Sequence, residues 1–541
     1  MKTVTTDNLR LSNRTEPHLR WRVLASFFSA AAICLSAQAL EVYQIPGNVT
    51  DGIDLLGMSD NYYTDRLEGR NNCTISGEVT HSSVTADNPF LLMGSHSGAT
   101  AFNPSTKLDK IPIRIVGGGS WKYQANDGGN ANYQCGAGQS GSSYGHLEFE
   151  SGSFQANALL LYGETETTAS LSIPGDCSAT FGTTVRVGTH EKSATLCIDG
   201  GNLTAYTVLE MSRGPKDGTA SANTSVNTVI VSNGTLSLNA KDTEGSVYMG
   251  RFGANDGADR TTDRDVIILG ENGVLCVKAI YHKRDPRGHI IFRGGRLELF
   301  RRGTTYVPDY AVENVDSGTL EIEGDGYPIR IDTQTNVINL VNTTLISGSI
   351  LLTGNGGFEK LGVGTLTMNN RYGTVISSFS GGVAVAEGTL KVAADGIIPA
   401  TNLLTVAEGA TFDMNGSAVG FTGALGAGII TNSSETAATL TLGYGDGDYA
   451  FSATVGERIS IVKVGTGTLT VSGNAANNDC DLDIASGTVV FGVKNSTTYR
   501  NVTVRSGATL DISKCNFVCT NLVKEPGGII KPKPGLSIFI R

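Results

Sequence analysis

The stretch KLGVGTLTM, residues 360–368, returns further along the chain as KVGTGTLTV, residues 463–471. The two copies share their lysine, both glycines and a Thr-Leu-Thr segment at identical spacing, and neither contains an obvious catalytic group. A phrase that is repeated without catalytic side chains indicates an architectural role. The residues around the two copies therefore decide which fold the sequence predicts.

The same pattern, a glycine followed by a short apolar segment, recurs through most of the chain. Successive glycines are mostly about 20–24 residues apart or about twice that, and a fixed period of this size is typical of a solenoid, in which each repeat stacks on its neighbour. Leucine-rich and helical repeats are the competing interpretations, but their consensus patterns are absent from this sequence. The glycines that open the segments are Gly234, Gly273, Gly295, Gly318, Gly364, Gly388, Gly409, Gly467, Gly487 and Gly507.

Apolar and polar residues alternate with a period of two inside each unit, as expected for strands with one buried face. A second strand precedes many of the glycines. The glycine makes the corner between the strands, where a positive φ angle costs other residues roughly 1 kcal/mol or more. Coils of this kind stack into an all-β fold, a right-handed parallel β-helix (solenoid) with about 20–24 residues per coil. The residues predicted to face the interior after the corner are Leu366, Met368, Leu390, Val392, Leu469, Val471, Leu510 and Ile512. Those before it are Val229, Val231, Ile267, Leu269, Val383, Val385, Leu404, Val406, Leu482, Ile484, Val502 and Val504.

Two longer segments carry a family resemblance. Residues 356–396, GGFEKLGVGTLTMNNRYGTVISSFSGGVAVAEGTLKVAADG, resemble the autotransporter-associated β-strand repeat. That repeat opens on Lys-x-Gly-x-Gly-Thr-Leu and closes on Ser-Gly-Gly-x-x-Val-x-x-Gly-Thr-Leu. Residues 439–474 are similar to the segment that leads into it, so the resemblance covers about residues 339–513.

The resemblance implies an exported bacterial protein with a β-helical fold and a structural or adhesive role, because such repeats are typical of autotransporter passengers and large surface proteins. In an autotransporter a membrane barrel follows the passenger, whereas here only the short segment 514–541 follows the region of resemblance. We therefore expect separate export or anchoring machinery. A surface location also implies surface glycans, or components of host or neighbouring cells, as partners.

The N-terminal residues are predicted to be a signal peptide. Several arginines precede an apolar run at residues 23–35, and Ala37-Gln38-Ala39 has the small-x-small form of a cleavage site. The run is shorter than the ~20 residues that span a bilayer, and no later segment has the character of a membrane span. We expect a secreted or cell-surface protein with no integral membrane segment after signal removal. The predicted organisation is 1–39 signal peptide, 40–200 irregular N-terminal β region or cap of the solenoid, 201–520 β-helix, and 521–541 C-terminal cap or tail.

Composition supports a β-rich chain. There are 69 glycines but 14 prolines, and only 17% of residues are charged, which is unlike a disordered sequence. The net charge of −10 predicts no binding of nucleic acid, because phosphate contacts need a basic face. Eight of the nine cysteines remain after the predicted cleavage, an even number that is compatible with disulfides. For Cys515 and Cys519 a local disulfide and two buried thiols both stay open, and no zinc site is predicted because further ligands are missing nearby.

One basic segment, residues 278–302, stands out in this acidic chain. A cationic groove of this kind can bind an anionic glycan. A solvated loop with outward-facing charges is the competing interpretation. An arginine or lysine could also act as a base in catalysis, so the alternative function is a polysaccharide-degrading lyase or glycosidase on the same scaffold, although we predict no catalytic residue. The candidate residues for glycan binding are His282, Lys283, Arg284, Arg287, His289, Arg293 and Arg296.

Two acidic stretches are candidate calcium ligands. NDGADRTTDRD, residues 255–265, lacks the spacing of an EF-hand loop. GYGDGD, residues 443–448, occurs once, whereas a stacked calcium repeat needs several copies. A solvated turn explains the first stretch better, and the family resemblance places the second within the ordinary pattern of the repeat. The sequence therefore predicts neither a metal site nor a cofactor.

Overall fold

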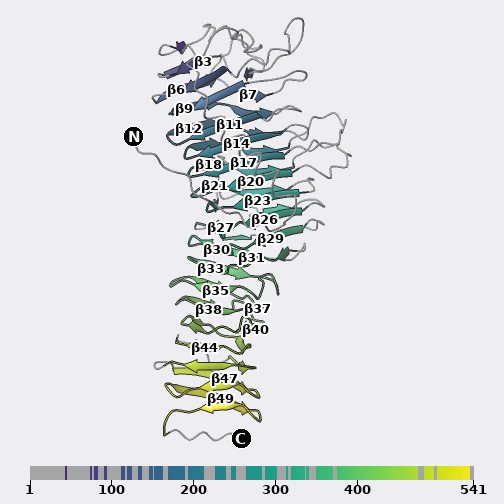
Figure 1. Ribbon diagram of the computed structural model, residues 1–541, viewed down its shortest axis with the longest axis vertical. Helices are drawn as coiled ribbons and strands as arrows, with labels where there is room; N and C mark the ends of the chain where they lie inside the picture. Colours follow the sequence, from purple (N-terminus) through teal and green to yellow (C-terminus); the bar gives the residue numbers. More distant parts are fainter. Residues whose placement is uncertain are drawn as a thin grey trace, which may run out of the picture. The chain divides into compact units, whose positions relative to one another are not determined.

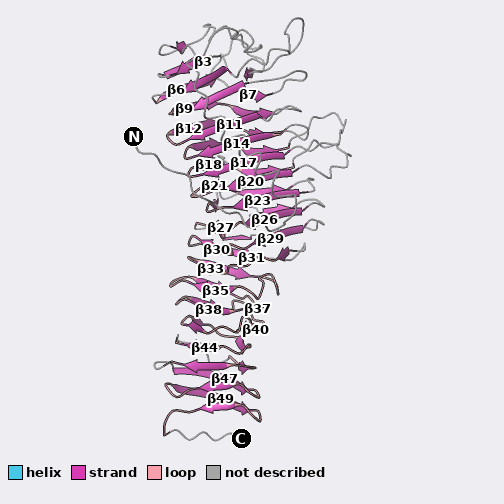
Figure 2. Ribbon diagram, in the orientation of Figure 1, coloured by secondary structure: helices cyan, strands magenta, loops and turns pink. Residues whose placement is uncertain are grey.

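The computed structural model describes part of the chain. The described part contains strands and no helix, so it is all-β as predicted (Figure 2). None of its segments is a helix long and apolar enough to cross a membrane. Residues 43–541 form one compact unit, and the predicted signal peptide lies outside the described residues. The described residues are 43–45, 73–75, 78–82, 90–93, 111–115, 118–124, 132–136, 145–149, 151–162, 169–188, 193–212, 226–238, 245–250, 264–282, 287–300, 312–314, 319–334, 337–339, 349–368, 375–472, 480–492 and 496–535.

The strands stack as coils, and each coil adds one strand to several parallel sheets (Figure 1). In the N-terminal half, sheet neighbours such as β9 (Gly152–Ala156) and β12 (Cys177–Phe181) are three strands apart in the chain, so one coil has three strands. Towards the C-terminus, neighbours such as β46 (Thr488–Phe491) and β48 (Thr509–Asp511) are two apart, so one coil has two strands. This is the parallel β-helix that the repeat predicts.

Four sheets contain the N-terminal coils. The 13-stranded sheet has β3 (Glu78–Ser82), β6 (Gly119–Gln124), β9, β12, β15 (Asn202–Ala205), β18 (Thr235–Leu238), β21 (Val274–Val277), β24 (Arg296–Leu299), β27 (Ile329–Asp332), β30 (Phe358–Leu361), β33 (Val383–Val385), β35 (Leu403–Val406) and β38 (Gly423–Leu425). The first eight-stranded sheet has β4 (Phe90–Met93), β7 (Asn132–Gly136), β10 (Ala158–Tyr162), β13 (Val185–Val187), β16 (Val208–Met211), β19 (Ser246–Met249), β22 (Ala279–His282) and β25 (Val312–Asn314). The second eight-stranded sheet has β11 (Ala169–Pro174), β14 (Ala194–Asp199), β17 (Val226–Ser232), β20 (Arg264–Leu269), β23 (Arg287–Phe292), β26 (Thr319–Gly324), β29 (Ser349–Gly354) and β32 (Val375–Ser377). The four-stranded sheet has β1 (Tyr43–Ile45), β2 (Cys73–Ile75), β5 (Ile111–Ile115) and β8 (Gly145–Phe149).

Three shorter sheets continue the stack. One has β28 (Val337–Asn339), β31 (Thr365–Met368), β34 (Thr389–Val392), β36 (Thr411–Asp413), β39 (Ile429–Thr431) and β42 (Thr454–Val455). The next has β37 (Ala418–Phe421), β40 (Ala438–Leu442), β43 (Ile459–Lys463), β45 (Leu482–Ile484), β47 (Ser496–Val504) and β49 (Asn516–Lys524). The last has β41 (Tyr449–Phe451), β44 (Thr468–Val471), β46, β48 and β50 (Ile529–Lys531).

One continuous core runs through the stack. All the residues predicted to face the interior are buried and belong to this core, so the predicted alternation is confirmed. In β31, for example, Leu366 and Met368 are fully buried while the two threonines between and before them are half-buried on the opposite face. Burying a side chain of this size contributes about 1.5–3 kcal/mol relative to its exposure to water, so the stacked apolar residues are the main stabilising element.

The length of a coil varies along the stack. Near the C-terminus Leu482 pairs with Val502, which is one predicted period further along the chain. In the N-terminal half Val229 pairs with Ile267, which lies well beyond one predicted period. Here the predicted period is too short, because the extra residues come between strands, for instance between β19 and β20. The coil length therefore changes while the strand register in the core is kept.

The corner glycines serve two purposes. Gly487 has a φ of +71°, as predicted for a sharp corner. At Gly234, Gly273, Gly295 and Gly467 the expectation of a positive φ is wrong. Beside Gly273, for example, the left-handed residue is its neighbour Asn272, with a φ of +52°. Gly273 is needed for another reason, because a Cβ atom there would collide with the carbonyl oxygen of Val231 in the coil before.

Candidate functional site

The predicted glycan-binding residues lie on different sheets. His282 ends β22 in the first eight-stranded sheet, and His289 lies on β23 in the second. Arg293 lies in the bend after β23, and Arg296 begins β24 in the 13-stranded sheet. Outside the described part lie Lys283, Arg284 and the side chain of Arg287.

His282 faces the interior of the solenoid. Its side chain is fully buried, and it is in register with the core residue Met249. A Cβ atom at Gly288 would lie 2.7 Å from Cδ2 of His282, so the imidazole fills the space beside that glycine. Because it is fully buried, His282 is out of reach of a glycan.

Among the predicted glycan-binding residues, the two arginines whose side chains are described, Arg293 and Arg296, each have a carboxylate partner. Nε of Arg293 lies 2.8 Å from Oδ2 of Asp325 in the next coil. Nε of Arg296 donates to Oε1 of Glu298 on its own strand at 2.8 Å. Partly exposed pairs like these contribute little to stability, about 0–1 kcal/mol each. They nevertheless neutralise the positive charge, so the structure does not gather the described basic residues into one cationic groove.

His289 faces two carboxylates instead. It lies directly opposite Glu321 on β26, and Glu323 follows on the same face of that strand. Nε2 of His289 is 2.9 Å from Oε2 of Glu323, and one ligand atom from each of the three residues lies within 4.8 Å of the others. His289 is 5% exposed, and both glutamates are half-buried. The described charge around His289 is therefore negative.

Sequence reasoning missed Glu321 and Glu323, although the segment GTLEIEG at residues 318–324 carries a signal. Charged residues at two alternate positions of a strand share its outward face, one coil after the strand that contains His289. The sequence does not reveal the register. His289 pairs with Glu321, which lies further along the chain than one predicted period.

The lysine of the first repeated phrase lies inside the solenoid. Lys360 is fully buried on β30. Its Nζ atom donates hydrogen bonds to the carbonyl oxygens of Leu361 at 2.8 Å, Gly362 at 2.6 Å and Glu387 at 3.2 Å. An ammonium group has three donors and no acceptor, so it matches three carbonyl groups that converge at a corner.

The second copy repeats this arrangement. Lys463 on β43 is 1% exposed. Its Nζ atom donates to the carbonyl oxygens of Val464 at 2.6 Å, Gly465 at 3.0 Å and Ser486 at 3.4 Å. In both copies the acceptors are the two residues after the lysine and the residue before the corner glycine of the next coil. The repeated lysine thus ties one corner to the next.

Burial changes the acid–base behaviour of both lysines. It lowers the pKa of Lys360 to about 8, and the nearby carboxylates of Asp332 and Glu387 oppose this only in part. Burial also lowers the pKa of Lys463, with carboxylates again opposing. The cause is the loss of water around the charged form. The contribution of each lysine to the free energy of unfolding therefore depends on pH.

The acidic stretch GYGDGD meets the second repeated phrase. Oδ1 of Asp446 accepts a hydrogen bond from the backbone amide of Thr466 at 2.6 Å. Oδ1 of Asp448 accepts one from the amide of Thr468 at 2.6 Å. The bond from Thr466 holds the pKa of Asp446 below its usual 3.8. Both carboxylates therefore hold the backbone of the adjoining coil.

The other acidic stretch is described only at its end. Asp265 is fully buried and accepts hydrogen bonds from the Ser212 hydroxyl, from Nδ2 of Asn227 at 3.3 Å and from the amide of Gly250 at 2.7 Å. Burial raises the pKa of Asp265 to about 6. This carboxyl group joins the bends after β16 and β19 to strand β17 inside the solenoid.

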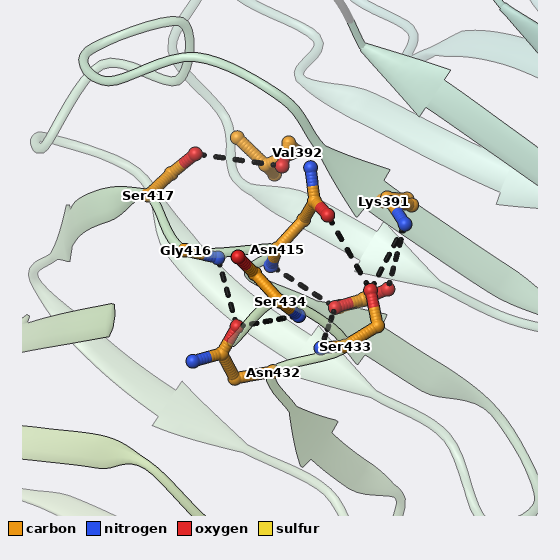
Figure 3. A network of polar contacts seen from close by, with 9 residues as sticks. Lys391, Val392, Asn415, Gly416, Ser417, Asn432, Ser433 and Ser434 are labelled. Atoms are coloured by element: carbon orange, nitrogen blue, oxygen red, sulfur yellow. Dashed lines mark hydrogen bonds and ion pairs between the residues drawn. The ribbon is translucent and has the colours of Figure 1, made fainter. Parts of the chain in front are cut away.

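A further polar network joins the coils after β34 (Figure 3). Asp413 accepts hydrogen bonds from the amides of Asn415 at 3.0 Å and Ser433 at 2.9 Å, and it lies 3.6 Å from Nζ of Lys391. The side-chain oxygen of Asn432 likewise accepts two backbone amides, at 2.8 and 3.1 Å. Short polar side chains often bond turn backbones in this way, so the network holds the turns in place.

The six cysteines whose side chains the structure describes, Cys177, Cys197, Cys276, Cys480, Cys515 and Cys519, are thiols, and no disulfide joins these six. Of the two alternatives for Cys515 and Cys519, the structure has two separate thiols. Burial raises the pKa of both, which keeps them protonated and weakly reactive at neutral pH.

These contacts define the chain as a parallel β-helix protein in which many of the described polar side chains connect neighbouring coils. No protein-family model, no curated protein and no solved structure matches the chain.

Proposed function

We propose that this chain is an exported bacterial β-helix protein with a structural or adhesive role, at the cell surface or in the extracellular space. The observation that supports this most is the use of its polar residues. The buried lysines of the repeated phrases, Asp446 and Asp448 all bind backbone groups of adjoining coils. Charged groups that stabilise the stacking of the coils favour a rigid scaffold, which suits a structural or adhesive role.

The proposed location rests on the sequence. The predicted signal peptide directs export, and the resemblance to autotransporter-associated repeats favours a cell-surface or secreted protein. The partners that suit this location are surface glycans or components of host or neighbouring cells, with separate machinery for export or anchoring. A net charge of −10 disfavours nucleic acid as a partner.

Export is tested by expressing the full chain in a Gram-negative host and sequencing the N-terminus of the material outside the cytoplasm. We expect a chain that begins near Leu40. Full-length chain that stays in the cytoplasm would contradict the export proposal.

Adhesion is tested on a glycan array, and turnover of acidic polysaccharides is followed by ultraviolet absorbance in the same samples. The variant Lys283→Ala/Arg284→Ala/Arg287→Ala probes the basic segment, and Arg500→Ala/Arg505→Ala, which removes exposed arginines elsewhere, is its control. Saturable binding that only the first variant loses supports an adhesin. Absence of binding and turnover leaves the structural role, whereas unsaturated sugar products would show a lyase and contradict the proposal.

A further inference from the structure

The second eight-stranded sheet carries a cluster of groups that the proposed function does not use. His289, Glu321 and Glu323 project from one face of β23 and β26. Their neighbours Ile290 and Ile322 alternate with them and lie in the core, so the three polar side chains point away from it. The cluster therefore faces outward from two adjacent coils.

The three ligand atoms converge. One nitrogen or oxygen atom from each residue lies within 4.8 Å of the other two. Three atoms at mutual distances of this size can surround one ion, because zinc–nitrogen and zinc–oxygen bonds are about 2.0–2.2 Å long.

The surroundings hold these side chains in place. Oγ1 of Thr353, on the next strand β29, donates a hydrogen bond to Oε1 of Glu321 at 3.0 Å. On the other side Val266 lies directly opposite His289, and Val266 and Ile291 are each 9% exposed. A carboxylate ligand fixed by a hydrogen bond, beside an apolar wall, is the environment that strengthens metal binding.

The charges also favour a cation. Two glutamates on alternate positions of one strand repel each other. Among the described side chains of the cluster, one histidine faces them. A divalent ion would neutralise both. The donor set, one imidazole nitrogen and two carboxylates, suits borderline ions such as Zn²⁺, Mn²⁺ or Co²⁺ better than Ca²⁺ or Mg²⁺, which prefer oxygen ligands throughout.

We propose that His289, Glu321 and Glu323 form a binding site for a divalent transition-metal ion of the Zn²⁺ class. Three protein ligands leave at least one coordination position for water or for a ligand from a partner. The bound ion joins two successive coils, one that contains β23 and one that contains β26. The proposal does not depend on the proposed function.

Cobalt is the probe, because its visible absorption reports the ligands. The purified chain, freed of metal by chelation, is titrated with Co²⁺ and then with Zn²⁺. We expect one Co²⁺ per chain, a spectrum without a thiolate-to-cobalt band, and displacement by Zn²⁺. The double variant Glu321→Gln/Glu323→Gln keeps the shape of both side chains and is expected to lose at least about tenfold in affinity.

The matched control is Glu359→Gln. Glu359 is a half-buried glutamate on β30 that pairs with Arg330 at 2.7 Å, and its substitution leaves Co²⁺ affinity unchanged. Circular dichroism melting checks that both variants keep the fold. Lack of saturable binding, a spectrum that shows thiolate ligation, or equal affinity in the double variant would each overturn the proposal.

Discussion

Lys360→Met removes the ammonium group that three backbone carbonyls share at the first repeated corner. The methionine has a similar length and no donor, so the carbonyl groups of Gly362 and Glu387 lose their bond from the lysine. The Leu361 carbonyl keeps a second donor, the amide of Thr333 at 3.1 Å. A carbonyl group without a partner costs about 1–3 kcal/mol where water cannot reach it, so the variant is expected to be less stable than the natural chain.

The size of this loss of stability depends on pH. The pKa of Lys360 falls from its usual 10.5 to about 8 in the fold. Between these values the unfolded chain binds more protons than the folded chain, so the contribution of Lys360 to stability rises with pH. Integration of the two titrations gives a rise of about 2 kcal/mol from pH 7 to about pH 9.5. Lys360→Met lacks this rise, so its deficit relative to the natural chain grows by the same amount.

The assay is urea unfolding followed by circular dichroism at both pH values. Comparison with the natural chain cancels the titration of buried cysteines and tyrosines, which also contribute in this range. Lys391→Met is the control, since Lys391 is partly exposed and its pair with Asp413 is worth less than about 1 kcal/mol. A deficit of Lys360→Met that stays constant or shrinks between the two pH values would contradict a lowered pKa of Lys360. The hydrogen bonds to the three carbonyl groups would then stabilise the charged ammonium group more than burial destabilises it.

Three further predictions concern the corner glycines, the carboxylate of Asp446 and the thiols. Gly487→Ala combines a φ of +71° with a collision against two carbonyl groups, so its urea midpoint is expected to fall further than that of Gly507→Ala, which has a φ of +78° but open space around it. Equal urea midpoints for the two variants would show that the close approach of the neighbouring coil does not add to the cost of Gly487→Ala. Because its pKa is lowered, Asp446 stabilises the fold above the usual carboxyl range, and this stabilisation is lost as pH falls through the folded pKa. When the free energy of unfolding is measured against pH in the acid range, Asp446→Ala is expected to show a smaller loss of stability than the natural chain. An equal loss in both would contradict the hydrogen bond that Asp446 accepts from the next coil. A non-reducing peptide map is expected to show Cys515 and Cys519 as free thiols, and a linked peptide would contradict the structure.

Much of the fold could be predicted because two simple periods coincide in the sequence. The alternation around Leu366 fixes which face of the strand is buried, and the glycine period fixes how often the strand returns. Both depend on local residues, so they are readable without the structure. The predicted coil length holds near the C-terminus and fails near Val229, since insertions between strands lengthen a coil without changing its core.

The sites were harder to predict for the same reason. His289 meets Glu321 only because the coil between them is longer than the predicted period, and nothing local in the sequence gives that length. The role of Lys360 is also hard to predict, because a lysine at an inward position of a strand breaks the apolar pattern that marks the core. Its place becomes clear only when the carbonyl group of Glu387 is seen beside it.

A distance between two spin labels shows whether coils that are far apart in sequence stack in register. Thr365 and Thr454 are distant in the chain but are joined by four successive parallel pairings, through Thr389, Thr411 and Ile429. With ~4.8 Å per pairing, the backbones lie about 19 Å apart. Labels carried by keto-bearing unnatural amino acids avoid the native cysteines, and the account predicts a narrow distribution near this distance and a shorter one for Thr389 with Thr454. A broad distribution, or one centred beyond about twice this distance, would contradict the stacked coils.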